Sequence, residues 1–309
     1  MSISIAIVNW NTRNMLDQCL KSIYSTVSED VEVIVVDNAS SDGSIDMLRS
    51  EYPQVKRIAN TDNAGFARAN NQAFDICNAD YFMLLNPDTI ILDNAIELLI
   101  DKLEQNPSCA IAAPKLLEKD GSIQPSVGKF PCLTSELFDA LGLSNFIFNR
   151  DHPHFYIPDD DKPSCIDWAT GACLLVRRSA VPDSRKILDE RYFMFSEETD
   201  LCKCLKNAGW SIIYEPRARV MHFGSGSTSQ VRRDMLTQLY KSKFIYFSKH
   251  KSPSYANTYR AGIIPLRLFM RILCFLPSLL LHRSNSAGLI SHLKNQCSVV
   301  RASFGWGGK

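Results

Sequence analysis

The sequence predicts an α/β protein built on a Rossmann-like mixed sheet with helices on both faces, followed by a C-terminal helical appendage. In the first 117 residues, short apolar runs alternate with segments of helical periodicity, which is typical of parallel strands joined by helices. After about residue 230 the chain becomes helical, and a strongly apolar stretch follows near its end. The two patterns indicate a large sheet domain and a separate helical segment.

The expected elements of the first part follow from two periodicities. Continuous apolar runs of four to six residues predict buried strands, and apolar residues three or four positions apart predict helices. The expected strands span residues 3–8, 31–36, 55–58, 81–85 and 110–113, and the expected helices span 15–24, 44–50, 65–77 and 95–105.

The middle of the chain has a weaker pattern. A Lys-Asp-Gly-Ser turn at 119–122 predicts a hairpin, and a mobile excursion should follow it as far as residue 163. Regular structure should return at 168–177, continue through 192–210 and end in a strand at 211–214.

Composition narrows the class of protein. The 34 basic and 33 acidic residues give a net charge of +1, which argues against a nucleic-acid-binding protein. Ten scattered cysteines and a strand-like start without a signal-peptide pattern favour a reducing cytoplasm. Cys202 and Cys204 should point to different faces of a helix and serve packing rather than metal binding.

Polar segments follow three of the expected strands, at 9–12, 37–43 and 86–89. In open parallel sheets ligands bind at these carboxyl ends, so the three segments are candidates for one binding site. Asp37 and Asn38 have side chains able to bond a pyrimidine edge and a ribose. The structural alternative is a turn in which Ser41 or Asp42 caps the next helix, and the two roles are compatible.

The segments 35–44, 63–71 and 84–89, in this order and about 20 residues apart, resemble the inverting family 2 glycosyltransferases, particularly the bacterial rhamnosyltransferase-like branch. The resemblance covers roughly residues 3–250 and implies a GT-A fold. The nucleotide would lie over residues 1–117 and the acceptor over 118–250, with 251–309 as a helical segment outside the catalytic domain.

The resemblance also implies which residues bind the donor and a divalent cation. Asp88 occupies the place of the metal-binding acidic motif, and His222, after the final core strand, would be a second ligand of Mg²⁺ or Mn²⁺. A turn in which Asp88 caps a helix is the structural alternative. The donor-binding candidates are Val8, Trp10, Asp37, Asn38, Asn63, Gly65, Asn70, Asn86, Trp168 and Gly171. Trp168 would lie under the transferred sugar, or be an ordinary core aromatic.

The catalytic candidates are Glu197 and Glu198, in the position where relatives carry a Glu-Asp pair ahead of a helix. The resemblance makes the second carboxylate the general base, which points to Glu198, although the change from aspartate to glutamate leaves Glu197 open. Carboxylates also favour helix N-termini without any catalytic role. Three acids within the four positions 197–200 exceed what capping requires.

The expected reaction is a single displacement with inversion, moving a sugar from a nucleotide diphosphate to an acceptor hydroxyl. The resemblance suggests dTDP-L-rhamnose as donor, with UDP-sugars next, and a glycan or lipid-linked oligosaccharide of a surface polysaccharide or O-antigen as acceptor. A non-catalytic nucleotide-sugar-binding protein is the alternative. A dinucleotide oxidoreductase is disfavoured because no G-x-G-x-x-G follows the first strand.

The apolar stretch 262–282 contains Pro265, Arg267, Arg271 and Pro277, and arginine in hydrocarbon is costly, so a membrane-spanning helix is not expected. Two interpretations stay open: a helix pair in the plane of the lipid headgroups, or a helix packed on the catalytic domain. The first predicts a cytoplasmic protein in peripheral contact with the inner face of the cell membrane. Oligomeric state stays open.

Overall fold

A computed structural model of the chain describes residues 2–27, 31–143, 155–158, 162–183, 185–224, 232–281 and 286–306. Within these ranges, only the backbone is described for residues 232–233, 274–281 and 286–293. Its packing divides the chain into two compact units. The sheet unit comprises 1–130, 156–193 and 197–230, and the helical unit comprises 131–155, 194–196 and 231–309. The division by packing does not test the boundary of the catalytic domain expected at residue 250, which stays a prediction about function.

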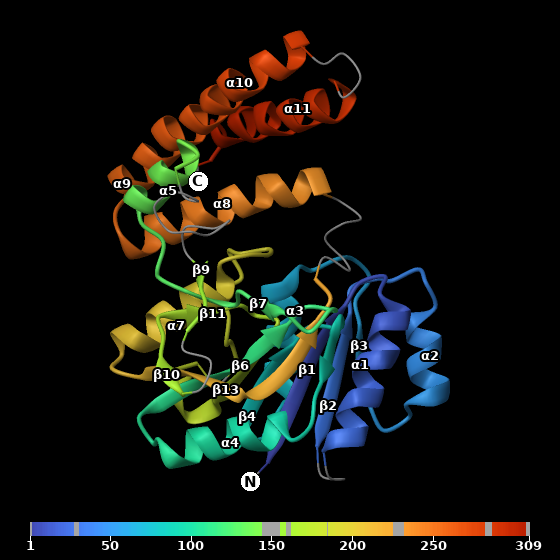
Figure 1. Ribbon diagram of the computed structural model, residues 1–309. Coiled ribbons are helices and arrows are strands. Elements are labelled where there is room, and N and C mark those ends of the chain that lie inside the picture. Colours follow the sequence, from blue (N-terminus) through green and yellow to red (C-terminus); the bar gives the residue numbers. More distant parts are fainter. Residues whose placement is uncertain are drawn as a thin grey trace. The chain divides into compact units, whose positions relative to one another are not determined.

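The sheet unit begins with alternating strands and helices (Figure 1). They are β1 (Ile3–Asn9), α1 (Arg13–Thr26), β2 (Glu32–Asp37), α2 (Ser44–Glu51), β3 (Lys56–Ala59), α3 (Phe66–Ile76), β4 (Tyr81–Leu85), β5 (Thr89–Ile91), α4 (Ala95–Gln105) and β6 (Cys109–Leu117). All the strands and helices expected in the first 117 residues are confirmed. The short β5 was not expected.

The remaining elements of the sheet unit include further strands of the main sheet and strands of a separate three-stranded sheet. They are β7 (Ile123–Gln124), β8 (Val127–Gly128), β10 (Ser164–Cys165), β11 (Trp168–Ala169), β12 (Cys173–Arg177), the 3₁₀ turn η1 (Arg178–Ala180), α7 (Glu197–Asn207) and β13 (Ser211–His222). β9 (Phe155–Tyr156) lies at the boundary of the two units. The hairpin expected at 119–122 is confirmed as β6–β7, and the strand expected at 211–214 extends to residue 222.

The main sheet has the order β10-β13-β6-β12-β4-β1-β2-β3. β4, β1, β2 and β3 are parallel, whereas β12 is antiparallel to both β4 and β6. The sheet is therefore mixed, as predicted. Its buried Ile, Val and Leu side chains form one core with the inner faces of α1 and α4, because strands covered on both faces must be apolar throughout.

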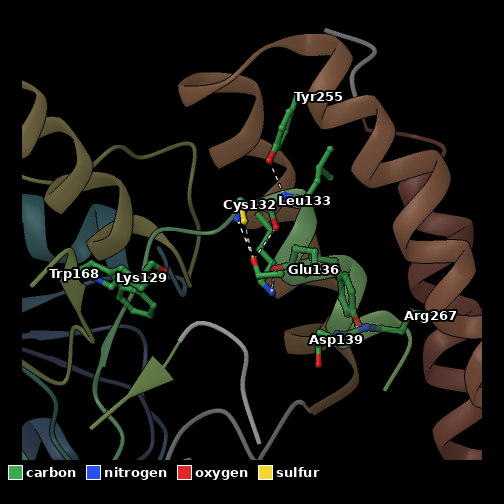
Figure 2. Close-up of polar contacts among 11 residues, drawn as sticks. Lys129, Cys132, Leu133, Glu136, Asp139, Trp168, Tyr255 and Arg267 are labelled. Atoms are coloured by element: carbon green, nitrogen blue, oxygen red, sulfur yellow. Dashed lines mark hydrogen bonds and ion pairs between the residues drawn. The ribbon is translucent and has the colours of Figure 1, made fainter. Parts of the chain in front are cut away.

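Helices make up most of the second unit: α5 (Leu133–Ala140), α8 (Arg232–His250), α9 (Pro253–Thr258), the π-helical turn η3 (Tyr259–Ile263), α10 (Ile264–Leu281) and α11 (Ser286–Ser303). Figure 2 shows the polar contacts of α5, where the Leu133 N–H donates to Tyr255 Oη at 2.6 Å and Asp139 pairs with Arg267. A buried ion pair joins Glu136 of α5 to Lys243 of α8 at 2.6 Å. These contacts hold α5, which the weak pattern of 118–163 did not predict, within the unit.

The C-terminal prediction needs one correction. Residues 264–281 form one helix, α10, rather than a pair of helices, since the helix continues past Pro277 and packs on α5 and α11. Tertiary packing outweighs the hydrogen bond that a proline removes. Among the described residues, no helix is both long and apolar enough to cross a bilayer.

The two cysteines of α7 differ in environment. Cys202 is buried, as a packing residue should be, but Cys204 is exposed, so the packing role predicted for Cys204 is wrong. Positions two apart on a helix face in different directions, which explains why only Cys202 reaches the core.

Candidate active site at the strand ends

The predicted polar segments meet at one edge of the sheet. Asn9, the last residue of β1, is paired with Asp37, the last residue of β2, and Asn86 follows β4, whose Leu85 is paired with Ile7 of β1. Parallel strands end at the same edge, so the register alone brings the segments together. The candidates Val8 and Trp10 flank Asn9 and are both half-buried.

Asp37 is fixed by its neighbours. Its carboxylate accepts hydrogen bonds from Asn9 Nδ2 at 2.7 Å and from the Ser40 N–H at 2.9 Å, and the residue is buried. Asn9 is held in turn by Thr12, whose hydroxyl donates to Asn9 Oδ1 at 2.7 Å. Asn9 was not a predicted site residue, although its position at the end of β1 is a signal that could have identified it.

Asn38 belongs to a network of amides. Its Nδ2 donates to Asn63 Oδ1 at 3.2 Å, and its Oδ1 accepts from Asn60 Nδ2 at 2.9 Å. Asn63 Oδ1 also accepts the Gly65 N–H at 3.0 Å. Three predicted donor-binding residues, Asn38, Asn63 and Gly65, are thus brought together. Such a network orients each amide before a ligand arrives.

Gly65 is required at its position by close packing. Its φ of +81° is one that side chains disfavour, and a Cβ placed there would lie 2.5 Å from the carbonyl oxygen of Phe193. The same carbonyl accepts the Phe66 N–H at 2.7 Å. Gly65 therefore lets the start of α3 contact the segment that precedes Glu197.

Asn70 has one satisfied and one unsatisfied end. Its Nδ2 donates to the Phe66 carbonyl at 3.0 Å, while its buried Oδ1 has no hydrogen-bond partner among the described residues. An unsatisfied buried acceptor costs about 1–3 kcal/mol, so it is a reasonable place for a ligand donor. Its predicted contact with the nucleotide sugar stays a prediction.

The two predicted metal ligands lie side by side. β5 and β13 pair His222 with Thr89, and Asp88 Oδ1 is 3.3 Å from His222 Nε2. Asn86 Nδ2 lies 3.4 Å from the same nitrogen. Asp88 precedes β5 rather than a helix, and its carbonyl accepts the Phe223 N–H at 2.9 Å. The helix-capping alternative for Asp88 is therefore wrong.

This cluster fits a hard divalent cation. Two ligands of one six-coordinate ion, with bonds of about 2.1 Å at right angles, lie about 3 Å apart, close to the separation of Asp88 and His222. One carboxylate and one imidazole leave the other positions for phosphate oxygens and waters, as is usual for Mg²⁺. Asp88 is only 6% exposed, so its charge is poorly screened by water.

The catalytic candidates start helix α7. Burial raises the pKa of Glu198 from 4.5 to about 7, against the lowering effect of backbone and Thr199 hydrogen bonds, with a further raising effect from the Asp200 charge. Burial, and then the charge of Glu198, raise the pKa of Glu197 well above its usual range. Glu197 is 4% exposed, whereas Glu198 is only half-buried, so Glu198 is the more accessible of the two carboxylates.

Strained backbone precedes this pair. Phe195 and Ser196 have φ of 70° and 66°, a left-handed conformation that costs roughly 1–2 kcal/mol per residue outside glycine. Consecutive residues of this kind are uncommon and are concentrated at functional sites.

The dipeptide Gly171-Ala172 lies between Asn86 and Glu198. The Asn86 N–H donates to the Ala172 carbonyl at 2.9 Å, and a Cβ placed on Gly171 would lie 3.7 Å from Glu198 Cβ. Both the residue beside Asp88 and the candidate base therefore adjoin the same two residues. The absence of a side chain at Gly171 leaves space next to Glu198 and Phe66.

Trp168 packs as a core aromatic. It is 6% exposed, its indole N–H donates to the Lys129 carbonyl at 2.9 Å, and its ring lies on Gly128, where a Cβ would come within 2.6 Å (Figure 2). This contact uses the one polar group of the indole. The second role considered for Trp168, under the transferred sugar, stays a prediction.

The mixed sheet order and the polar strand ends are those expected of a glycosyltransferase of the GT-A fold. Comparison with known proteins agrees with this class. Residues 4–181 match the model of glycosyl transferase family 2, and the chain belongs to that family.

Individual relatives are similar over most or part of the chain. An N-acetylglucosaminyl-diphospho-decaprenol L-rhamnosyltransferase of Mycobacterium tuberculosis is 29% identical over 296 residues, covering 92% of this chain and 94% of the relative. Rhamnosyltransferase WbbL of Escherichia coli is 27% identical over 135 residues, covering 43% of this chain and 47% of WbbL. The structure of mannosyltransferase PcManGT from Pyrobaculum calidifontis, in complex with GDP-Man and Mn²⁺, shares the fold with a TM-score of 0.59 at 13% identity, covering 99% of this chain and 88% of that one.

Proposed function

We propose that this glycosyltransferase transfers L-rhamnose from dTDP-L-rhamnose, with inversion and with a divalent cation, to a hydroxyl of a lipid-linked saccharide. The observation that carries the mechanism is Glu198: an accessible carboxylate with a raised pKa, next to the dipeptide that binds Asn86. The rhamnosyltransferase names of the relatives support the sugar and the lipid-linked acceptor.

The donor would bind over the ends of β1, β2 and β4. Asp37 still has lone pairs for a ribose hydroxyl or a base N–H, because a carboxylate accepts about four hydrogen bonds and the described residues use two of them. Val8 and Trp10 would contact the base from the end of β1. The fixed amides of Asn38 and Asn63 would reject poorly fitting bases, since neither amide can rotate without breaking the hydrogen bond between them.

Asp88 and His222 would hold Mg²⁺ or Mn²⁺, and the bound ion would neutralise the charge that develops on the diphosphate leaving group. The PcManGT complex with Mn²⁺ supports this choice of ion by analogy of fold. Asn86 would orient the diphosphate from the side of the cluster that faces Gly171 and Ala172.

Glu198 would take the proton from the acceptor hydroxyl while that oxygen attacks the anomeric carbon from the face opposite the diphosphate. A general base works best when its pKa lies near the operating pH, and the raised pKa of Glu198 is about 7. Glu197 is too enclosed to touch an acceptor, so its role would be to shape the environment of its neighbour.

The test is a transfer assay with dTDP-L-rhamnose and UDP-sugars, Mn²⁺ and a polyprenyl-diphosphate-linked N-acetylglucosamine acceptor. The anomeric configuration of the product would be determined by NMR. Glu198→Gln should lower turnover about 10² to 10⁴-fold with donor affinity nearly unchanged, because a positioned base contributes about that factor. The exposed Glu51→Gln is the matched control. Retained configuration, or full turnover in the Glu198 variant, would refute the mechanism.

Two alternatives give different results. A UDP-sugar-dependent enzyme would show transfer and thermal stabilisation with UDP-sugars but not with dTDP-rhamnose. A non-catalytic binding protein would be stabilised by a nucleotide sugar and yet neither transfer nor hydrolyse it. Asp88→Asn should remove the Mn²⁺-dependent part of the stabilisation by dTDP, whichever sugar is transferred.

We also propose that the helical unit contacts the membrane that holds the acceptor. On α10, Phe269, Ile272 and Leu273 are 56%, 38% and 45% exposed, and their spacing places them on one side of the helix. Large exposed apolar side chains gathered on one side of a helix suit insertion into a bilayer surface.

Flotation with vesicles containing anionic lipids tests this contact. The double variant Phe269→Ser/Leu273→Ser should lose most of its vesicle binding, whereas Ile76→Ser, which removes an equally exposed apolar residue from α3 (43%), should bind normally. Equal binding of both variants, or no binding of the unaltered protein, would contradict the proposal.

A further inference from the structure

The β6–β7 hairpin places a carboxylate and an amide next to each other. Leu116 is paired with Gln124, and the Glu118 N–H donates to the Ser122 carbonyl at 2.8 Å. Glu118 and Gln124 are therefore diagonal neighbours on one face of the hairpin. Gln124 Nε2 donates to Glu118 Oε1 at 2.8 Å.

The other end of the Gln124 amide contacts His222, which is 98 positions away in the sequence. Gln124 Oε1 lies 2.7 Å from His222 Nδ1, and Gln124 Nε2 lies 3.4 Å from the His222 carbonyl oxygen. Because a carboxylate only accepts hydrogen bonds, Glu118 keeps the NH₂ group of Gln124 on its own side. The amide oxygen then faces Nδ1, and it also only accepts, so Nδ1 must carry the hydrogen.

A neutral imidazole with its hydrogen on Nδ1 has a lone pair on Nε2. This nitrogen faces Asp88 Oδ1 at 3.3 Å and Asn86 Nδ2 at 3.4 Å. The Asp88 carboxylate oxygen and the Nε2 lone pair thus face each other at a separation that suits two ligands of one cation. The Asn86 amide N–H can donate to the same lone pair when no cation is bound. The geometry is that of a metal site whose histidine is oriented by a hydrogen bond to its other nitrogen.

We infer that Gln124 and Glu118 are positioning residues, which hold His222 in its Nδ1–H tautomer and so direct the Nε2 lone pair at the cation site. This inference rests on the metal-dependent function proposed above. Neither residue touches the ion or the substrate. Their contribution is to remove the competing Nε2–H tautomer, which cannot bind a cation through Nε2.

The first experiment reads the tautomer in the absence of metal and donor. In protein labelled with ¹⁵N-histidine, at about pH 9 where imidazoles are neutral, two-bond ¹H–¹⁵N spectra assign the protonated nitrogen of His222, identified by comparison with His222→Ala. The unaltered protein should carry the hydrogen on Nδ1. In Gln124→Met, which keeps the length but removes the acceptor, the Nε2–H form should appear.

The second experiment measures Mn²⁺ affinity in the presence of dTDP by the loss of the free-Mn²⁺ EPR signal. Gln124→Met should weaken Mn²⁺ binding about 10 to 100-fold, which is the usual effect of removing the partner of a histidine ligand. Glu118→Gln should weaken Mn²⁺ binding less than Gln124→Met does, because the new amide oxygen still accepts a hydrogen bond from Gln124. Asp120→Asn is the control: it alters the same turn, where Asp120 accepts from Ser122, without touching Gln124.

The outcomes separate this inference from the proposed function. An Nε2–H tautomer in the unaltered protein, or unchanged tautomer and Mn²⁺ affinity in Gln124→Met, would overturn the positioning role even if rhamnose transfer is observed. The expected tautomer and affinity changes in a protein that transfers no rhamnose would support the positioning role and refute the proposed function instead.

Discussion

Replacing Glu198 by glutamine should stabilise the protein at neutral pH while it removes catalysis. Burial raises the pKa of Glu198 from 4.5 to about 7, so the folded protein binds a proton more tightly than the unfolded chain does. Between these values the folded state holds more protons, and the free energy of unfolding therefore falls as pH rises from about 4.5 to 7. Below about pH 4.5 Glu198 is protonated in both states and does not lower the free energy of unfolding. Above about pH 7 it is ionised in both states and lowers the free energy of unfolding by the full amount.

The size of the effect follows from the shift. A difference of 2.5 pKa units, from 4.5 to about 7, corresponds to about 3 kcal/mol at most. Glu198 is only half-buried, and solvent screening brings the expected value toward about 1–2 kcal/mol. The Glu198 charge also raises the pKa of Glu197, so Glu198→Gln removes this repulsion as well. The free energy of unfolding of the variant should therefore increase slightly more than the shift of Glu198 alone accounts for.

The assay is urea denaturation followed by tryptophan fluorescence, at intervals between about pH 4.5 and 8.5. The difference in the free energy of unfolding between Glu198→Gln and the unaltered protein should be close to zero at the acidic end and increase to a plateau above about pH 7. Glu51→Gln, at an exposed site, should show no such trend. A difference that does not change with pH would refute the reasoning, because it would show that the folded state does not resist ionisation of Glu198.

Two further predictions concern packing. Gly65→Ala should lower stability by about 1–3 kcal/mol or more in thermal denaturation, because φ is +81° and the new Cβ would meet the Phe193 carbonyl at 2.5 Å. Gly121 has a similar φ of +85°, but a Cβ added there would meet nothing within 4 Å, so Gly121→Ala should lower stability clearly less. Equal losses of stability in the two variants would contradict the close contact between Gly65 and Phe193. Lys243→Met should lower the free energy of unfolding by about 3–5 kcal/mol because it removes the ammonium group that pairs with the buried Glu136 carboxylate, and the double variant with Glu136→Gln should recover much of the loss. The lack of any recovery in urea denaturation would argue against the ion pair.

The sheet could be predicted from the sequence because its signals are local. The run 81–85 is apolar at every position, and such a run bounded by polar residues has few alternatives to a buried strand. The polar strand ends at Asp37 and Asn86 were predictable for the same reason, since parallel strands must end at one edge. Once the strands are known, the location of the site follows from topology.

Other features depend on contacts between distant residues. β5 has only three residues, and β13 pairs with it. Its residues Thr-Ile-Ile favour a strand, but a run of three is shorter than the four to eight residues by which a strand is recognised. The contact of Gln124 with His222 joins positions 98 apart, and nothing in the hairpin sequence indicates it. The distinction between Glu197 and Glu198 likewise depends on which carboxylate the folded chain encloses.

Three structural costs of this fold lie just before and within the first turn of α7. Phe195 and Ser196 hold left-handed backbone, Glu197 has a buried oxygen without a hydrogen-bond partner among the described residues, and Glu198 resists ionisation. A helix N-terminus favours carboxylates, so two ordinary exposed glutamates here would have stabilised the protein at no cost. Their enclosure instead raises the pKa of the accessible one toward neutrality, which is the property a general base needs and a helix cap does not. The arrangement therefore favours the proposed role of Glu198 in proton transfer over a role in stability.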